Sequence, residues 1–341
     1  MDYINYVKQS PMSMSGLGGS VGGLNFKSGS SPTWYGARGW WTGGSPGGPP
    51  IDTMQYITIA STGNATDAGN LGQAVKACQS CGGGGRILTA GGNKQTDNDK
   101  HFSNEIQAHV SATTSNSSDF GDLTVARSYL SAVSDGTRGL WATGRDSSED
   151  DSQTMDYVTI ASNGNATNFG YFGWASGYHG NARTIGTAGC TGATRGAWAG
   201  GKQPGLPFIG SFYYVTIQTT SNTTTGIQEL TTKARYLASL SNDARGVWAG
   251  GDVQGSPGYT NRIEYMTIAN MSSTSDFGDL TATAQFHSGL SDGTAQRGVF
   301  APITEGNSNV MDYITIDSTG NATDFGDLIS NISRCAGASN T

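Results

Sequence analysis

The chain has 341 residues, of which 52 are glycine; only 13% are charged, and the formal net charge is -7. This composition is typical of a turn-rich β protein and excludes a coiled coil or an acidic disordered tail. Because lysine is scarce and the charge balance is acidic, the chain lacks the clustered basic surface that neutralises phosphates. We therefore expect no nucleic-acid partner.

The first 33 residues differ in composition from the rest of the chain. Met1 is followed by Asp2 and Tyr3 rather than by a basic and then apolar leader, which favours a soluble protein without a secretion signal. No apolar run approaches the roughly 18 residues of a membrane helix, so we expect no membrane insertion. Residues 1–33 are rich in glycine and serine and cannot bury a core. They are predicted to form an extended N-terminal arm that orders against a partner chain.

From residue 34 onward the chain is repetitive. An Arg-Gly phrase followed by hydrophobic residues begins at Arg38, Arg138, Arg195, Arg245 and Arg297, with a degenerate copy at Arg86. The six copies are roughly 50 residues apart, which is the length of a kelch blade and longer than the roughly 40 to 45 residues of a WD blade. Diglycines such as Gly200-Gly201 follow several copies and are the hallmark of kelch repeats. The sequence therefore predicts a kelch-like propeller over residues 34–341.

Two further phrases complete each unit. A Tyr-x-Thr-Ile phrase, as at 157–160, is rich in the β-branched and aromatic residues of strands. An Asp-Phe-Gly-Asp-Leu phrase stands at 119–123, 276–280 and 324–328, and reads as the outer strand, with Phe120 and Leu123 filling the wedge between blades. The chain then returns to the centre over about 127–134, so each unit supplies four antiparallel strands.

The two chain ends are predicted to meet in one sheet. Residues 331–341 contain an inner-strand phrase with no Arg-Gly strand after it, whereas the first copy lacks an inner strand. Supplying that strand from the C-terminus closes the first blade, leaves no open edge and gives six blades. The alternative is a seventh partial blade made from the C-terminal strand and the N-terminal arm, because residues 1–4 echo 155–158 and 311–314.

Recurring polar residues are explained by turns. Asn-x-Ser/Thr triplets beginning at Asn64, Asn165 and Asn321 fall at the same place in successive repeats, which favours turn chemistry over glycan attachment. The residues 134–137, Ser-Asp-Gly-Thr, also fit a tight turn. The loops between the second and third strands differ in length and composition, so we expect them to carry specificity on one face of the ring. They span residues 45–53, 93–104, 145–154, 202–211, 252–262 and 303–310.

No group of residues in the sequence has the full spacing of a metal site. Cys78 and Cys81 have the separation of a zinc knuckle, but no second ligand pair is spaced to complete it, which favours ordinary thiols. The acidic run at 146–151 lacks the glycine-punctuated spacing of a calcium loop. The four histidines occupy unrelated repeat positions and predict no ring of imidazoles; they are His101, His109, His179 and His287.

Arginines recur near the start of the inner strands, at Arg127, Arg183, Arg235 and Arg334. They could line the central channel and hold an acidic ligand or a sugar carboxylate. The alternative is an ion pair with the preceding Asp122 or Glu229, and recurrence in so many blades favours that structural role. No catalytic, cofactor-binding or metal-ligating residue is assigned.

The repeat phrases resemble those of kelch-like proteins of marine tailed bacteriophages, cyanophages in particular. The likeness covers residues 34–341 and is carried by phrases such as 312–316, 324–328 and 245–251. The chain departs from the pattern at Ala68 in place of phenylalanine, over 106–110, where the strand phrase is broken, and at Pro302, where the diglycine is lost. These departures affect single blade edges.

The resemblance implies a non-enzymatic virion protein, tail- or fibre-associated and present in multiple copies, and therefore a location on the phage particle. We expect the arm to bind other tail or capsid proteins and the ring to serve assembly or contact with a host-surface glycan or protein. The alternative is a carbohydrate-binding or carbohydrate-active propeller. An enzyme of that kind would need an asymmetric pair of carboxylates on one face, whereas the aspartates here are mainly repeat-borne.

Overall fold

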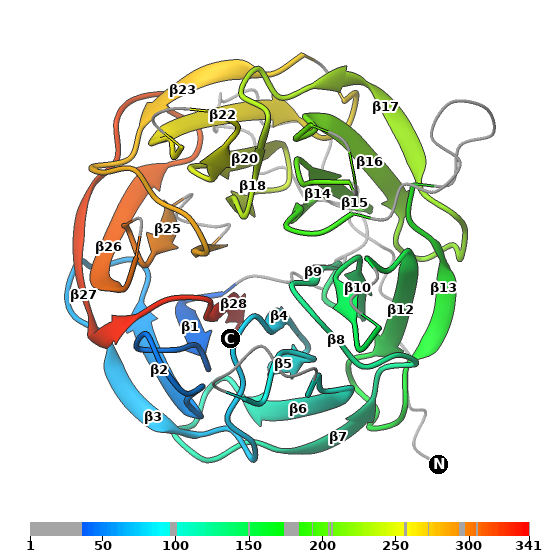
Figure 1. Ribbon diagram of the computed structural model, residues 1–341. Coiled ribbons are helices and arrows are strands. Elements are labelled where there is room, and N and C mark those ends of the chain that lie inside the picture. The colour runs from blue at the N-terminus through cyan, green and yellow to red at the C-terminus, as the bar shows by residue number, and fades with distance from the viewer. Residues whose placement is uncertain are drawn as a thin grey trace, which may run out of the picture. The chain divides into compact units, whose positions relative to one another are not determined.

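The computed structural model describes residues 36–95, 101–148, 151–173, 184–192, 194–203, 205, 207–255, 258–271, 273–292, 297–304 and 306–340. These residues form a β-propeller of six four-stranded antiparallel blades (Figure 1). The predicted fold class is confirmed. The N-terminal arm predicted for residues 1–33 lies outside the described residues. No helix in the described part of the chain is long and apolar enough to cross a membrane.

Each blade runs from an innermost strand at the central channel to an outermost strand at the rim. Blades one and two, innermost strand first, are β28 (Ala336–Asn340), β1 (Arg38–Thr42), β2 (Thr53–Thr58), β3 (Thr66–Asn70), and β4 (Gln79–Gly83), β5 (Arg86–Ala90), β6 (Glu105–Val110), β7 (Ser118–Asp122). Blades three and four are β9 (Ser131–Ser134), β10 (Arg138–Ala142), β12 (Thr154–Thr159), β13 (Thr167–Tyr171), and β14 (Ala188–Gly192), β15 (Arg195–Ala199), β16 (Ser211–Thr216), β17 (Thr224–Glu229). Blades five and six are β19 (Ala238–Ser241), β20 (Arg245–Ala249), β22 (Arg262–Thr267), β23 (Ser275–Asp279), and β24 (Ser288–Ser291), β25 (Arg297–Ala301), β26 (Ser308–Thr315), β27 (Thr323–Ile332).

The C-terminal strand closes the first blade. β28 pairs antiparallel with β1, from Arg38 opposite Asn340 to Thr42 opposite Ala336. The six-blade prediction is therefore confirmed, and the described C-terminal strand forms no seventh blade. The closing strand is shorter than predicted, because β27 continues to Ile332 before the chain turns inward. Residues 331 and 332 belong to the rim of blade six.

The second strand of each blade is buried on both faces. In β20 the side chains of Val247 and Trp248 point to opposite sides, and each is almost fully buried. Val247 packs with residues of blade six such as Phe300, whereas Trp248 packs with residues of blade four such as Phe212. Alternate residues of one strand thus belong to two different interblade cores, which explains why the phrase is apolar throughout.

The repeated arginine links neighbouring blades. In five blades its guanidinium lies 4.6 to 4.7 Å from the centroid of the tyrosine ring on the third strand of the same blade. Its Nη1 also donates to a backbone carbonyl of the next blade, for example from Arg138 to Ile217 at 3.2 Å and from Arg245 to Ile316 at 2.9 Å. The Arg-Gly and Tyr-x-Thr-Ile phrases therefore encode one interblade contact.

The glycine of the Arg-Gly phrase is required by close packing. A Cβ atom added to Gly139 would lie 2.6 Å from Sγ of Cys81, and one added to Gly298 would lie 2.5 Å from Leu240. Both neighbours belong to the innermost strand of the preceding blade. In these blades the second strand thus approaches that strand too closely for a side chain at this position.

The outer strand carries a second required glycine. Gly121 has a φ of +147°, and a Cβ there would lie 2.4 Å from the carbonyl oxygen of Gly164 in the next blade. Beside it, Oδ1 of Asn165 accepts a hydrogen bond from the backbone N–H of Asp122 at 3.1 Å. Asn64 and Asn321 make the same contact with Asp327 and Asp279. The amide oxygens of these asparagines thus join adjacent blades, whereas turn chemistry within the repeat was predicted for them.

One predicted weakness is wrong. Residues 106–110, which depart from the Tyr-x-Thr-Ile phrase, belong to the complete six-residue strand β6, paired with both β5 and β7. Backbone pairing from both neighbours imposes the extended conformation there, irrespective of side-chain identity. Phe120 and Leu123, predicted to fill the wedge between blades, pack with Val158 and Ile160 of blade three as expected.

Candidate binding site at the channel mouth

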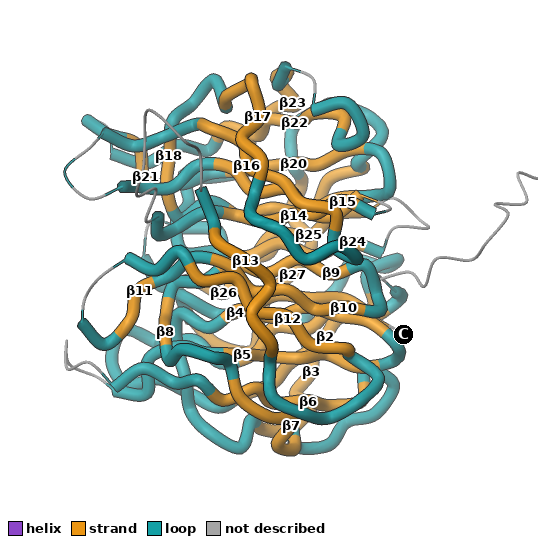
Figure 2. Tube along the Cα trace, turned by 90° about the vertical axis from the view of Figure 1, so that its right-hand side faces the viewer, coloured by secondary structure: helices purple, strands orange, loops and turns teal. Residues whose placement is uncertain are grey.

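The predicted specificity loops lie on one face of the ring. In every blade the loop after the second strand is bonded to the segment that leads down into the channel as the innermost strand. These pairs are Ser45 with Ser333, Asn93 with Lys76, Arg145 with Ser128, Lys202 with Ile185, Asp252 with Arg235, and Thr304 with Gln285. Figure 2 shows two of these pairings, β8 (Arg127–Ser128) with β11 (Arg145–Asp146) and β18 (Ala234–Arg235) with β21 (Asp252–Val253), on the same side of the molecule. We call this side the loop face.

A ring of left-handed residues surrounds the channel at the loop face. The residue that follows each of the six loop contacts has a positive φ, between 55° and 57° at Ala77, Tyr129, Tyr236 and Arg334. The remaining two are Gly186 at 70° and Phe286 at 52°. A non-glycine residue in this conformation is strained by about 1 kcal/mol or more, and such strain often occurs at functional sites.

Backbone hydrogen bonds join this ring from blade to blade. The N–H of Tyr129 donates to the carbonyl of Ala77 at 2.8 Å, and the N–H of Ala77 donates to Arg334 at 2.9 Å. The same bond runs from Arg334 to Phe286, from Phe286 to Tyr236, and from Tyr236 to Gly186. The backbone is therefore nearly the same in all six blades at the mouth, while the side chains differ.

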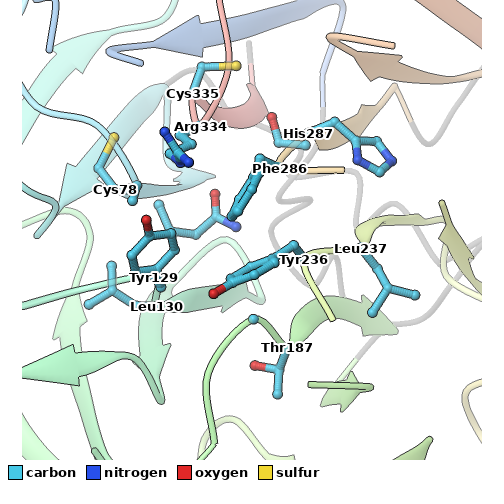
Figure 3. A pocket seen from close by; sticks show the side chains of 14 residues that line it. Cys78, Tyr129, Leu130, Thr187, Tyr236, Leu237, Phe286, His287, Arg334 and Cys335 are labelled. Carbon is cyan, nitrogen blue, oxygen red and sulfur yellow. The ribbon is translucent and has the colours of Figure 1, made fainter. Parts of the chain in front are cut away.

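Those side chains form an aromatic pocket at the mouth (Figure 3). The rings of Tyr236 and Phe286 have centroids 4.2 Å apart, and the ring of Tyr129 lies 5.5 Å from Tyr236. The guanidinium carbon of Arg334 lies 4.4 Å from the centroid of Phe286. The four side chains are among the 14 residues that line a cavity of about 60 Å³. Aromatic rings beside one cation form a surface suited to planar or acidic ligands.

Three arginines act on Tyr236 at the mouth. Burial, together with the neighbouring Tyr129, raises the pKa of Tyr236 to about 12, while the positive charges of Arg235, Arg145 and Arg334 act in the opposite direction. Arg235 is paired with Asp252 at 2.7 Å, and Arg145 with Asp151 at 3.4 Å. Within the described residues, Arg334 has no carboxylate partner, and its Nε is buried without a hydrogen bond. Arg334 is thus available to an anion.

The predicted recurrence of inner-strand arginines is wrong. Arg334 stands at the left-handed position, Arg235 one residue before it and Arg127 two residues before it, so their side chains occupy different places. Arg127 is fully buried and bonds Asp156 rather than Asp122, and Glu229 pairs with Lys233 rather than with Arg235. Arg127 and Arg235 pair with carboxylates that the sequence distance does not reveal, whereas Arg334 has no carboxylate partner among the described residues. Arg183 lies outside the described residues.

The four cysteines, His109 and His287 are buried, and the described residues form no metal site. All four cysteines are free thiols, and burial raises the pKa of Cys78 and of Cys335 to about 12, which disfavours the thiolate that binds metals. Burial also lowers the pKa of His109 to about 4 and of His287 to about 3. His101 is exposed, and His179 lies outside the described residues.

The acidic run does not gather into a cluster among the described residues. Asp146 accepts a bond from the backbone N–H of Ser148, and Asp151 pairs with Arg145. Glu149 and Asp150 of the same run lie outside the described residues.

Three buried carboxylates instead serve the contacts between blades. Asp156 accepts bonds from Thr124 and Arg127, and Glu264 accepts the backbone N–H groups of Thr231 and Thr232. Asp312 accepts the backbone N–H and the hydroxyl of Thr281. Burial raises the pKa of Asp156 and of Asp312. All three stand at the same position of the third strand, each next to the repeated tyrosine, so their role is structural.

Below the mouth the channel is narrow and lined by small residues. The innermost strands alternate Gly, Ser or Ala with a larger residue that points between the blades. Hydroxyl groups at one level donate to the carbonyl of the neighbouring strand: Ser134 to Gly82, Ser241 to Thr191, Ser291 to Ser241 and Ser339 to Ser291. The six strands thus converge because their side chains are small and their hydroxyls are bonded sideways.

No protein-family model matches the chain, and no curated protein sequence matches it either. The geometry therefore defines a class of protein, a six-bladed β-propeller with an aromatic and cationic pocket at the mouth of its channel.

Proposed function

We propose that the protein is a non-enzymatic component of a tailed-phage particle whose loop face recognises a partner surface. The observation that carries this proposal is the channel mouth. There the backbone repeats in all six blades, whereas the side chains differ and bring Tyr129, Tyr236, Phe286 and Arg334 together. Recognition requires such asymmetry on a rigid support.

The placement of the acidic groups supports a binding role over catalysis. A glycosidase needs two free carboxyl groups facing one ligand, one of them a general acid. Asp156, Glu264 and Asp312 are each occupied by hydrogen bonds between blades, and Asp252 is paired with Arg235. These four carboxylates thus stabilise the propeller and are not free to face a ligand.

The virion assignment rests on the resemblance of the repeat phrases to the kelch-like proteins of marine tailed phages. In this proposal residues 1–33 anchor the protein to another tail or capsid protein, and the propeller is displayed in several copies. Labelling intact particles with an antibody against the propeller tests the assignment. We expect label on the tail or fibres; particles that lack the protein would contradict it.

A carbohydrate-binding role is the second candidate, and the mouth also favours it. Sugar rings stack on aromatic faces such as that of Tyr236, and the Arg334 guanidinium matches a sugar carboxylate. Binding of the full chain to a panel of neutral and acidic oligosaccharides distinguishes the candidates. Selective binding of acidic sugars that is lost in Arg334→Ala supports a lectin; equal binding by the variant contradicts it.

A further inference from the structure

Blade two departs from the repeat at two neighbouring positions of β6. In the other blades the third strand carries a tyrosine followed by a buried apolar residue, as in Tyr157-Val158. In β6 these positions are Ala108 and His109. The register confirms the match, because Ala108 lies opposite Leu88 just as Tyr157 lies opposite Leu140.

The missing tyrosine ring leaves a cavity of about 200 Å³ at this place. Its lining includes Arg86, Ala108, His109, Asn116 and Asn163. The two asparagines are exposed, so the cavity opens to solvent. Arg86 begins β5, whereas the loop of blade two emerges after β5 ends at Ala90. The cavity is therefore on the face opposite to the loop face.

Arg86 keeps its structural contacts but lacks its aromatic partner. Its Nη1 donates to the carbonyl of Ile160 at 3.3 Å and to Oδ1 of Asn163 at 2.8 Å, as the other repeated arginines bond the next blade. In five blades a phenol ring lies 4.6 to 4.7 Å from the guanidinium. Within the described residues, no carboxylate lines the cavity or pairs with Arg86. One planar face of the guanidinium is thus left without a ring.

His109 follows Ala108 in β6, so its side chain projects from the other face of the strand, toward blade one. The residue is only 4% exposed, and neither of its ring nitrogens has a hydrogen-bond partner. Its ring is packed against Trp40 with a centroid distance of 4.4 Å. Because burial lowers its pKa to about 4, the imidazole is neutral at neutral pH and has one donor and one acceptor nitrogen. The imidazole therefore belongs to the interface of blades one and two and does not face the place of the missing tyrosine ring.

We propose that this cavity binds a phenolic ring, supplied either by a small phenol or by a tyrosine side chain of a partner protein. The ring takes the place of the tyrosine that blade two lacks and stacks on Arg86, as in the other five blades. Its hydroxyl lies beside exposed polar groups of the lining such as Asn116 and Ser118. This site is separate from the loop face and does not depend on the function proposed for it.

Titration of the full chain with 4-methylphenol, the side-chain analogue of tyrosine, tests the proposal by calorimetry or ligand-observed NMR. We expect one site per chain with a dissociation constant on the order of a millimolar. Ala108→Tyr restores the repeat, fills the cavity and weakens binding by about tenfold or more, while the Tm rises by about 2 °C. Ala108→Leu fills the cavity with a smaller side chain and is expected to act in the same direction.

A matched variant creates the cavity elsewhere. Tyr157→Ala removes the ring beneath Arg138 in blade three, and the variant is expected to bind a second 4-methylphenol. The saturated 4-methylcyclohexanol, which cannot make the cation–π contact, is expected to bind more weakly to both proteins. Equal affinity of the wild type and Ala108→Tyr, or no saturable binding to the wild type at millimolar concentration, would overturn the proposal.

The source of the ring is distinguished with N-acetyl-tyrosinamide, which carries the same phenol on a peptide backbone. Binding as tight as that of 4-methylphenol assigns the site to a tyrosine of a partner protein. Binding of 4-methylphenol alone assigns it to a free phenol, because the backbone is then excluded. Both results support a phenol site.

Discussion

The interface between blades one and two differs from the interface between blades two and three. In the latter, Trp141 on the second strand reaches the innermost strand of the preceding blade and donates from Nε1 to the carbonyl of Gln79 at 3.1 Å. In the former, Thr89 stands at the position of that tryptophan. Its hydroxyl joins those of Thr42 and Ser80 in a buried cluster with distances of 2.8 to 3.1 Å.

Two large side chains, Trp40 of blade one and Ile87 of blade two, compensate for the missing tryptophan. Trp40, fully buried, projects from blade one toward Ile87 and Ala338, at a position where blade three has Leu140. Ile87 itself replaces the glycine of the Arg-Gly phrase, and the innermost-strand residue it meets is Ala338 rather than the Cys, Val or Leu of other interfaces. The comparison teaches that the ring tolerates changes of residue when the total volume at an interface is retained.

The largest expected effect follows from removing the compensating tryptophan. Trp40→Ala leaves a cavity that Thr89 cannot fill, and we expect the free energy of unfolding to fall by about 4 kcal/mol. Denaturant unfolding measures the change. Leu140→Ala at the corresponding position of blade three is the control, and it should cost less because a smaller side chain is removed. A loss below that of the control would show that Trp40 does not fill the interface.

The second prediction transfers the blade-two residue to a regular interface. Gly139→Ile forces a side chain against Sγ of Cys81 and is expected to destabilise the protein by about 3 kcal/mol. Adding Cys81→Ala reproduces the pairing of Ile87 with Ala338 and should recover most of that loss. If the double variant is no more stable than Gly139→Ile alone, the combined side-chain volume at these two positions does not determine stability.

The regular blades could be predicted from the sequence because their contacts repeat. Arg245, Gly246 and Tyr265 recur with the same neighbours in five blades, so period and phrase order were enough to give six blades and the closing strand. The strand over 106–110 was expected to be broken, yet it pairs on both sides. Backbone pairing tolerates a residue such as Ala108 that lacks strand propensity.

The third prediction concerns pH, and it again contrasts blade two with the others. The pKa of His109 is about 4 in the folded protein and about 6.5 when unfolded, so the unfolded chain binds a proton in this window while the native one does not. Stability therefore falls as the pH is lowered from 6.5 towards 4. Between pH 7 and pH 5 the wild type loses free energy of unfolding. His109→Val, which has the valine of blades three and four, should lose about 2 kcal/mol less. His287 contributes a similar loss in both proteins. Parallel stability profiles for the wild type and His109→Val would contradict the assignment.

The candidate sites could not be predicted from the sequence because they depend on alignment across blades. Arg334 occupies the same left-handed position of its blade as Tyr236 and Phe286 do of theirs, whereas the sequence pattern groups it with Arg127. The carboxylate that pairs with Arg127 is Asp156, 29 residues away on another strand. A cavity at Ala108 is visible only when the tyrosine of every other blade has been located in space.

The smallest expected effect on stability is at the channel mouth. Alanine stands naturally at the left-handed position in blade two, at Ala77, so Arg334→Ala is compatible with the backbone there. The side chain has no carboxylate partner among the described residues, and we expect the free energy of unfolding to change by less than about 1 kcal/mol. Thermal unfolding checks this; a larger loss would mean that Arg334 supports the fold.

Competition for host cells tests the proposed recognition by the loop face most directly. Under the virion proposal, the purified full chain is added to host cells before the phage, and phage adsorption is measured. We predict that the wild type and Ala108→Tyr reduce adsorption, whereas Tyr236→Ala/Arg334→Ala does not, although its Tm remains close to that of the wild type. Equal competition by the channel-mouth variant, or no competition by the wild type, would contradict recognition through this pocket.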